Sequence, residues 1–156
     1  MTKVAINALG RIGRATLKIV MDTPGLDLVA ANDIGTSASV EYLLKYDTVY
    51  GRYEKPVAAT PDGDLKIGDR RVRLLREREP ALLPWKAMDV DLVFECTGAF
   101  TRREDLDGHI RAGAAYVILS APSTGDDVET IVHGVNTPQG STRIISCASC
   151  TTNCIT

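Results

Sequence analysis

VAINALGRIGR, residues 4–14, is the stretch that decides the fold class. Residues 3–7 form a short, mostly apolar run that predicts a β-strand. From Gly10 the period changes, because Ile12, Ala15, Ile19 and Val20 recur at helical spacing and predict an amphipathic helix to about Asp22. Gly10 and Gly13, with Ala8 in the first position, form a variant of the G-x-G-x-x-G pattern that joins a strand to a helix.

This pattern predicts a dinucleotide-binding turn. Gly10 would let the backbone approach a pyrophosphate, and Gly13 would let helix and strand pack closely. The helix N-terminus would offer free N–H groups to the phosphates. Asp33 follows Gly13 by twenty residues, at the end of the second predicted strand, where an acid binds the adenosine ribose hydroxyls. The alternative is a glycine turn of another α/β domain in which Asp33 only caps the next element.

Ala8 is the defect in the pattern. Its methyl group restricts φ where glycine would be free, so we expect the tight turn to be slightly reshaped.

The rest of the chain alternates between strands and helices. Apolar runs predict strands at residues 26–31, 90–96, 116–120, 130–135 and 143–146, and turns within residues 57–75 predict small antiparallel hairpins. Helices are expected around residues 40–44 and from a capping box at Thr101–Glu104 to a C′ glycine at Gly113. The order predicts an α/β fold, a doubly wound and mostly parallel sheet with helices on its faces.

Composition excludes several classes of protein. The chain has 156 residues, of which 44% are hydrophobic and 24% are charged, which is typical of one globular domain. Its formal charge of −2 gives no excess of basic residues for binding nucleic acid. No apolar run approaches the roughly 20 residues of a membrane helix. The first residues lack the features of a signal peptide. We therefore expect a cytoplasmic protein with reduced thiols.

The segments described so far, and SCASCTTNC above all, resemble the NAD-binding domain of the glyceraldehyde-3-phosphate dehydrogenases. The resemblance runs over residues 3–154 and is carried by VAINALGRIGR, AAND, YLLKYDTVYGRY, EREPALLPW, ECTGAFTRRE, VILSAPS, HGVN and ASCTTNC. It implies a glycolytic, homotetrameric, phosphorylating oxidoreductase. Such an enzyme oxidises glyceraldehyde 3-phosphate through a cysteine thiohemiacetal and thioester, with hydride transfer to NAD, and inorganic phosphate cleaves the thioester. A close relative, erythrose-4-phosphate dehydrogenase, and a stand-alone nucleotide-binding or redox-responsive module remain as alternatives.

The resemblance assigns roles to individual residues. The nucleophile is Cys150, beside which Ser149 and Thr151 bind substrate and phosphate. The cofactor residues are Asn7, Gly10, Arg11, Ile12 and Gly13 at the pyrophosphate turn, Asp33 at the ribose, Arg78 near the adenine, Thr97 and Gly98 in a lining loop, and Ser120 on the nicotinamide side. Three residues depart from the usual family pattern: Ala8 for glycine, Cys96 for serine or threonine, and Cys147 for asparagine.

The same resemblance predicts a domain boundary. Residues 1–148 would form the NAD-binding domain, and residues 149–156 would begin the first helix of the catalytic domain. The family's catalytic histidine and phosphate-binding arginines come after that point. We therefore expect the chain alone to bind cofactor without turnover. Asp33 should repel a 2′-phosphate and favour NAD, although small residues at 35–37 leave NADP open.

Three of the four cysteines fall within residues 146–156, in SCASCTTNCIT. Cys150 follows a strand and starts a predicted helix with Ser149 as N-cap, a position that favours the reactive thiolate. A zinc site through Cys147, Cys150 and Cys154 would need a fourth ligand, for which only Cys96, His109 or His133 remain.

A thioredoxin-like redox pair is disfavoured because that motif follows the first strand of its fold. We expect Cys96, Cys147 and Cys154 to be small, buried, inert thiols, and no metal to be bound. His109, in a helix, and His133, in a strand, should be structural or surface residues.

Overall fold

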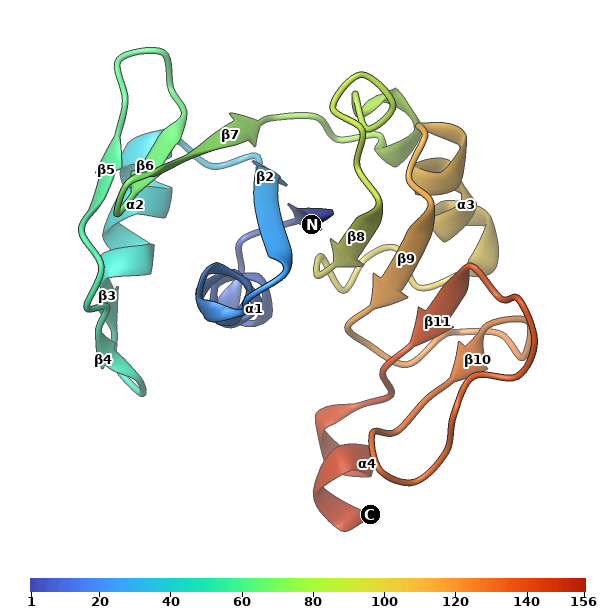
Figure 1. Ribbon diagram of the computed structural model, residues 1–156. Helices are drawn as coiled ribbons and strands as arrows, with labels where there is room; N and C mark the ends of the chain where they lie inside the picture. The colour runs from blue at the N-terminus through green and yellow to red at the C-terminus, as the bar shows by residue number, and fades with distance from the viewer.

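The computed structural model describes residues 1–156 and is built on one twisted sheet of nine strands in the order β10-β11-β9-β8-β1-β2-β7-β6-β5 (Figure 1). Every pair from β10 to β7 is parallel, and the sheet continues with antiparallel pairs, β6 with β7 and β5 with β6. The parallel strands are β1 (Thr2–Asn7), β2 (Leu26–Asn32), β7 (Arg70–Leu75), β8 (Leu92–Glu95), β9 (Tyr116–Leu119), β10 (Glu129–Thr130) and β11 (Ile144–Ser146). The antiparallel extension is β5 (Val57–Ala59) and β6 (Leu65–Ile67), and a separate hairpin joins β3 (Tyr46–Asp47) to β4 (Gly51–Arg52).

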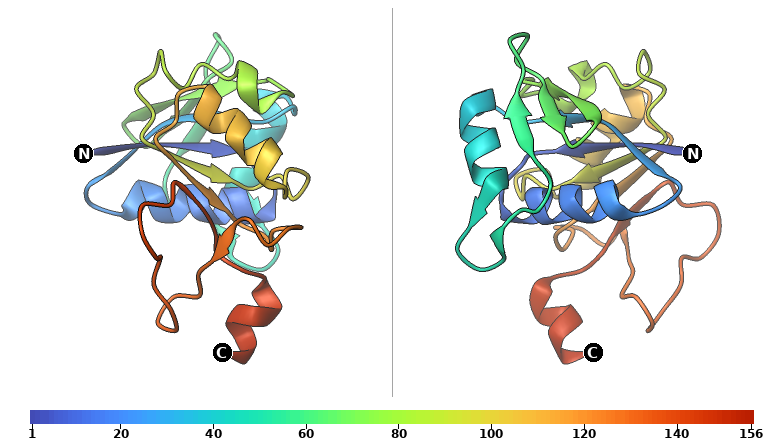
Figure 2. Two further views of the ribbon diagram at one scale, coloured as in Figure 1. Left: turned by 90° about the vertical axis from the view of Figure 1, so that its right-hand side faces the viewer. Right: turned by 60° about the vertical axis from the view of Figure 1, so that its left-hand side comes forward.

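Helices cover both faces of this sheet, as expected for a doubly wound α/β fold (Figures 1 and 2). They are α1 (Arg11–Asp22), α2 (Ser37–Lys45), α3 (Arg103–Arg111) and α4 (Cys150–Ile155), with a short 3-10 helix η1 (Pro80–Leu82). Side chains alternate along β1: Val4 and Ile6 join the core beneath α1 and α2, whereas Ala5 packs on the opposite face with Trp85. None of the helices has the length and hydrophobicity that a membrane-spanning segment requires.

The first strand–helix unit is confirmed, but the apolar stripe of α1 differs from the expected one. Its buried residues are Gly13, Leu17, Val20 and Met21. Ile12 and Ile19 are 54% and 66% exposed, so the periodicity of the apolar residues predicted the helix and misplaced its inner face. The reason is that Gly13, without a side chain, is the residue that faces β1 at the start of the helix.

Helix α3 ends as predicted and begins differently. Gly113 has φ 113° and donates to Ile110 O, while the Ala114 N–H donates to His109 O, which together form a Schellman motif. The capping box at Thr101–Glu104 is wrong. Arg102 is the N-cap and its side chain makes no cap hydrogen bond, whereas the Thr101 hydroxyl is bonded to the Thr124 hydroxyl across a loop.

The strand predicted at residues 130–135 is also largely wrong. Only Glu129–Thr130 pairs in the sheet as β10. After it the chain turns, since the N–H groups of Val135 and Asn136 both donate to Val132 O, and the Asn136 side chain accepts from the Val132 N–H. His133 therefore lies in an exposed turn and not in a strand. The antiparallel hairpins expected within residues 57–75 are confirmed as β5, β6 and β7.

The order of the strands creates a switch point at β1. The chain leaves β1 toward β2 on one side, and later returns to β8 on the other side. Ligands of open parallel sheets bind outside the carboxyl ends of the strands at such a point. Asn7, Asn32 and Glu95 are the last residues of β1, β2 and β8, so they meet there.

Candidate functional site

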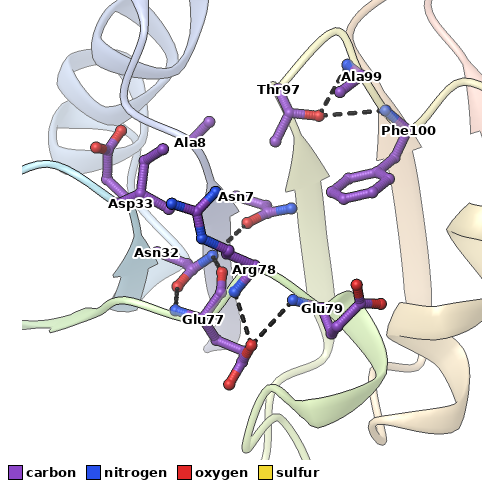
Figure 3. A pocket seen from close by; sticks show the side chains of 11 residues that line it. Asn7, Ala8, Asn32, Asp33, Glu77, Arg78, Glu79, Thr97, Ala99 and Phe100 are labelled. Atoms are coloured by element: carbon purple, nitrogen blue, oxygen red, sulfur yellow. Dashed lines mark hydrogen bonds between the residues drawn. The ribbon is translucent and has the colours of Figure 1, made fainter.

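A cleft of about 520 Å³ opens at the carboxyl ends of β1, β2 and β8 (Figure 3). It is lined by Asn7, Ala8, Asn32, Asp33, Ile34, Glu77, Arg78, Glu79, Thr97, Ala99 and Phe100. The structure thus brings together four residues that the sequence assigned to a dinucleotide site, namely Asn7, Asp33, Arg78 and Thr97.

The glycine turn forms the entrance to helix α1. A Cβ on Gly13 would lie 1.9 Å from Ala8 O, so glycine is required there for strand and helix to approach. A Cβ on Gly10 would meet nothing within 4 Å, which leaves open space over the helix N-terminus. Gly10 is the N-cap and provides no side-chain cap, so the N–H groups of the first turn are available to an anion.

Ala8 corrects one expectation. The turn is not reshaped to suit alanine, because Ala8 takes φ 73°, the left-handed conformation that glycine adopts without strain. The fingerprint geometry is therefore retained, at a conformational cost of about 1–2 kcal/mol for an L-residue.

Asp33 is held in place by the turn it faces. Its Oδ2 accepts from the Leu9 N–H at 2.7 Å, and its Oδ1 accepts from the Gly35 N–H at 2.7 Å. A carboxylate has about four acceptor positions, so two remain for hydroxyl donors in the cleft. Asp33 is thus an oriented acceptor and not the cap of α2, whose N-cap is Thr36.

One wall of the cleft is the segment Glu77–Glu79, which follows β7. The side chain of Asn32 ties this segment to the sheet: its Nδ2 donates to Glu77 O, and its Oδ1 accepts from the Glu77 N–H. The Glu77 carboxylate in turn accepts from the backbone N–H groups of Arg78 and Glu79. These bonds place the Arg78 side chain on the cleft (Figure 3).

The facing wall is the turn Thr97–Phe100 after β8 (Figure 3). The Thr97 hydroxyl organises it by accepting from the N–H groups of Ala99 and Phe100 at 3.1 and 3.4 Å. Gly98 has φ 69°, a conformation that suits glycine inside this turn. The two walls and the glycine turn therefore border the cleft with both polar and apolar groups.

Other predicted site residues border the cleft without lining it. Arg11 and Ile12 are exposed in the first turn of α1. Ser120 follows β9, where its N–H donates to Glu95 O. Sequence reasoning missed the lining residues Asn32, Ile34, Glu77, Glu79, Ala99 and Phe100. A usable signal for Asn32 was its place as a polar residue at the end of the buried strand β2.

The cysteine segment lies away from this cleft, on α4. Ser149 caps the helix as predicted, since its hydroxyl accepts from the Thr152 N–H at 2.9 Å. The Asn153 side chain donates to the carbonyls of Cys147 and Ser149 and closes the first turn. Cys150 is the first residue of the helix and is exposed.

The other three cysteines fall into two groups. Cys96 is buried, and this desolvation raises the pKa of its thiol to about 11. Cys147 and Cys154 are exposed, which corrects the expectation that they are buried. Partial desolvation still raises the pKa of Cys147. No group of three or more His, Cys, Asp or Glu side chains is placed to hold a metal ion.

The two histidines differ in environment. His109 is fully buried, with Nδ1 accepting from Trp85 Nε1 at 3.0 Å and Nε2 bonded to Glu95 Oε2 at 2.9 Å. His133 is exposed in the turn after β10. Neither histidine forms a hydrogen bond with Cys150.

Comparison with known proteins decides the family. The family model described as "Glyceraldehyde 3-phosphate dehydrogenase, NAD binding domain" matches residues 2–103, the part of the chain that contains the glycine turn, Asp33 and both cleft walls. The chain belongs to this family. It is therefore an NAD-binding domain of the glyceraldehyde-3-phosphate dehydrogenase type, as its α/β fold and cleft indicate.

Curated relatives extend the match to the cysteine segment. Glyceraldehyde-3-phosphate dehydrogenase of Clostridium pasteurianum is 43% identical over 157 residues, covering 99% of this chain and 46% of the relative. Glyceraldehyde-3-phosphate dehydrogenase 2 of Bacillus subtilis is 46% identical, covering 98% and 45%. The chromosomal enzyme of Cupriavidus necator is 45% identical, covering 98% and 47%. The chain spans about half the length of the curated relatives it matches.

Proposed function

We propose that this chain binds NAD in the cleft at the β1/β8 switch point and belongs to a phosphorylating glyceraldehyde-3-phosphate dehydrogenase. The observation that carries the proposal is the oriented Asp33 carboxylate, which has two acceptor positions left beside a glycine turn. An NAD molecule needs both features, an acceptor for its adenosine ribose and an N–H-lined helix end for its pyrophosphate.

The residues suit an extended dinucleotide. Its adenosine end would lie between Arg78 and Asp33, and its pyrophosphate would meet the backbone of Gly10, Arg11, Ile12 and Gly13. Asn7, Thr97 and Gly98 would line the middle of the ligand. The nicotinamide would then lie toward Ser120 and the carboxyl end of β11, from which the chain leads to Cys150.

The cofactor should be NAD in preference to NADP. Asp33 is held where the ribose 2′-oxygen is expected, and Glu77 and Glu79 add two carboxylates to the same cleft. A 2′-phosphate would meet this negative charge, with only Arg78 to offset it. NADP binding should therefore be weaker than NAD binding.

Cys150 would be the nucleophile of the complete enzyme. Its thiolate attacks the aldehyde carbon, and the resulting thiohemiacetal becomes a thioester once its hydride and hydroxyl proton have left. NAD supplies the hydride acceptor, and inorganic phosphate then cleaves the thioester. Ser149 and Thr151, which flank Cys150 at the exposed helix start, would contact substrate and phosphate.

We infer that a base for Cys150 comes from elsewhere, because His109 is buried with both ring nitrogens bonded and His133, in the exposed turn after β10, makes no hydrogen bond to Cys150. We place it in the portion of the family's length that this chain does not span. In this proposal residues 1–148 are the NAD-binding domain, residues 149–156 begin the catalytic domain, and the complete enzyme is a homotetramer. The chain alone should bind NAD without turning over glyceraldehyde 3-phosphate.

Calorimetric titration of the chain with NAD and with NADP tests the proposal. We expect saturable heat with NAD and weaker binding of NADP. In Asp33→Asn the ratio of NAD affinity to NADP affinity should fall. Asp69→Asn removes the same charge at an exposed turn residue and should leave that ratio unchanged. Absence of binding with either cofactor would reject the proposed function.

A further inference from the structure

Glu95, the last residue of β8, is a fully buried carboxylate behind the floor of the cleft. Four hydrogen-bond contacts converge on it. Oε1 accepts from the N–H and the hydroxyl of Thr97 at 2.7 and 2.5 Å. Oε2 accepts from Asn7 Nδ2 at 2.6 Å and lies 2.9 Å from His109 Nε2. One side chain therefore touches a cleft wall, the cleft floor and helix α3.

Hydrogen bonds on the cleft side show that Asn7 is the donor in its contact with Glu95. The backbone N–H and carbonyl of Glu77 cannot exchange places, so they fix which end of the Asn32 amide is oxygen and which is nitrogen. Asn32 Nδ2 also donates to Asn7 Oδ1 at 2.7 Å. This contact turns Asn7 Nδ2, a donor, toward Glu95.

A hydrogen bond from Trp85, on the opposite face of the sheet, shows that His109 is the donor in its contact with Glu95. The Trp85 indole N–H can only donate, so His109 Nδ1 is the acceptor of their 3.0 Å bond. A neutral imidazole with an accepting Nδ1 carries its proton on Nε2. His109 therefore donates to Glu95, and all four contacts on the carboxylate are donors.

We propose that Glu95 is a positioning residue of the dinucleotide site, which fixes Thr97 and Asn7 for binding and is itself held by His109 and Trp85. Only an ionised carboxylate accepts at all four positions. Through Thr97 it anchors the turn Thr97–Phe100, and through Asn7 and Asn32 it reaches the Glu77–Glu79 wall. Both walls of the cleft thus share one buried anchor.

The inference rests on the proposed function, and a substitution at Glu95 tests it. Glu95→Gln keeps the shape of the side chain but replaces one carboxylate oxygen by an NH₂ group. That NH₂ group would face a hydrogen-bond donor and lose the bond. We expect NAD affinity to fall about tenfold, the effect of losing one hydrogen bond to a charged group. Glu104→Gln, an exposed acid on the same α3 helix that carries His109, is the matched control and should bind NAD like the wild type.

A pair of substitutions at His109 separates positioning from packing. In His109→Gln the side-chain amide can still donate to Glu95, whereas in His109→Leu the donor is lost. NAD affinity should be close to wild type in the first variant and several-fold weaker in the second, at a temperature where both are folded by circular dichroism. Equal NAD affinity in wild type, Glu95→Gln and His109→Leu would overturn the proposal and leave the proposed function intact.

Trp85 offers a readout that needs no variant, because it is the only tryptophan in the chain. Its indole N–H resonance should move when NAD saturates the wild-type chain, although Trp85 does not line the cleft. An unmoved resonance at full NAD occupancy would also overturn the proposal. If the wild type binds no NAD at all, the proposed function itself fails, which is a different outcome from binding with an unmoved resonance.

Discussion

The cofactor cleft and the cysteine helix belong to one proposed reaction, but the chain builds them in different ways. The polar groups behind the cleft are buried side chains with fixed partners, such as Asn7, Asn32 and Glu95. Helix α4 has six residues, none of them buried, and it extends from the body of the domain (Figure 2). Its first turn is held by Ser149 and Asn153, which act only on neighbouring residues.

This difference shows that long-range contacts hold the binding site, whereas local contacts hold the segment that carries Cys150. The binding geometry depends on contacts between residues far apart in the sequence, so it is a property of the whole folded domain. The environment of Cys150 depends within this chain on local capping. Substitutions that disturb the glycine turn should therefore have global effects, and those at the cysteine segment should have local ones.

The largest effect should come from Gly13→Ala. The new Cβ would lie 1.9 Å from Ala8 O, which is backbone and cannot move aside without separating α1 from β1. We expect the free energy of unfolding in urea to fall by about 3 kcal/mol. Gly10→Ala is the control, because its Cβ meets nothing and should cost less than about 1 kcal/mol. A similar loss in both variants would show that close helix–strand approach is not what Gly13 provides.

The buried thiol should make the domain sensitive to alkali. In the unfolded chain Cys96 loses its proton near pH 9, whereas in the folded chain burial raises its pKa to about 11. Between these values the folded state binds more protons, so stability falls as pH rises from 9 to 11, by about 2–3 kcal/mol.

Urea unfolding across this pH range measures that loss. Cys96→Ser should remove the share that comes from the buried thiol and leave the share of Tyr53, whose pKa burial raises to about 12, while Cys154→Ser, which removes an exposed thiol, should change neither. An unchanged pH dependence in Cys96→Ser would contradict the assignment to this thiol.

At the cysteine segment, loss of the cap should have a local effect. Ser149→Ala removes the acceptor for the Thr152 N–H and should destabilise α4 by about 1 kcal/mol. Iodoacetamide should label Cys150 fastest in the wild type, as expected for an exposed thiol at a helix start, and more slowly in Ser149→Ala.

Peptide mass spectrometry would give the labelling rate of each cysteine. Ser141→Ala, at an exposed serine outside α4, should leave the rates unchanged. Equal labelling of Cys147, Cys150 and Cys154 in the wild type would argue against an activated nucleophile.

The smallest effect should be a gain in stability. Ala8→Gly relieves the strain at φ 73°, and the greater freedom of glycine in the unfolded chain offsets part of this gain. We expect a net stabilisation of about 0.5 kcal/mol by urea unfolding. Ala15→Gly, within helix α1, should instead destabilise by up to about 1 kcal/mol. Destabilisation by Ala8→Gly would mean that the turn is not strained.

The contrast between the two regions also explains what could be read from the sequence. The first strand–helix unit and Asp33 were predictable, because glycine spacing and apolar periodicity are local signals. The anchor at Glu95 was not, since it joins Asn7, Thr97 and His109, and no local pattern reports such pairing. For the same reason the Thr101 cap was mispredicted, because its hydroxyl is bonded to Thr124 across a loop.

The expected burial of Cys147 and Cys154 failed for a related reason. Cysteine is often buried in proteins, but Cys154 lies on α4, none of whose residues is buried, and Cys147 lies in the connection that leads to this helix.

Asp33 and the walls of the cleft should form the adenosine half of an NAD site in this chain. The most direct test is calorimetric titration of the 156-residue chain with NAD, ADP-ribose and nicotinamide mononucleotide. We expect ADP-ribose to bind with nearly the same Kd as NAD, and nicotinamide mononucleotide to bind far more weakly. Tight binding of nicotinamide mononucleotide without binding of ADP-ribose would contradict this expectation.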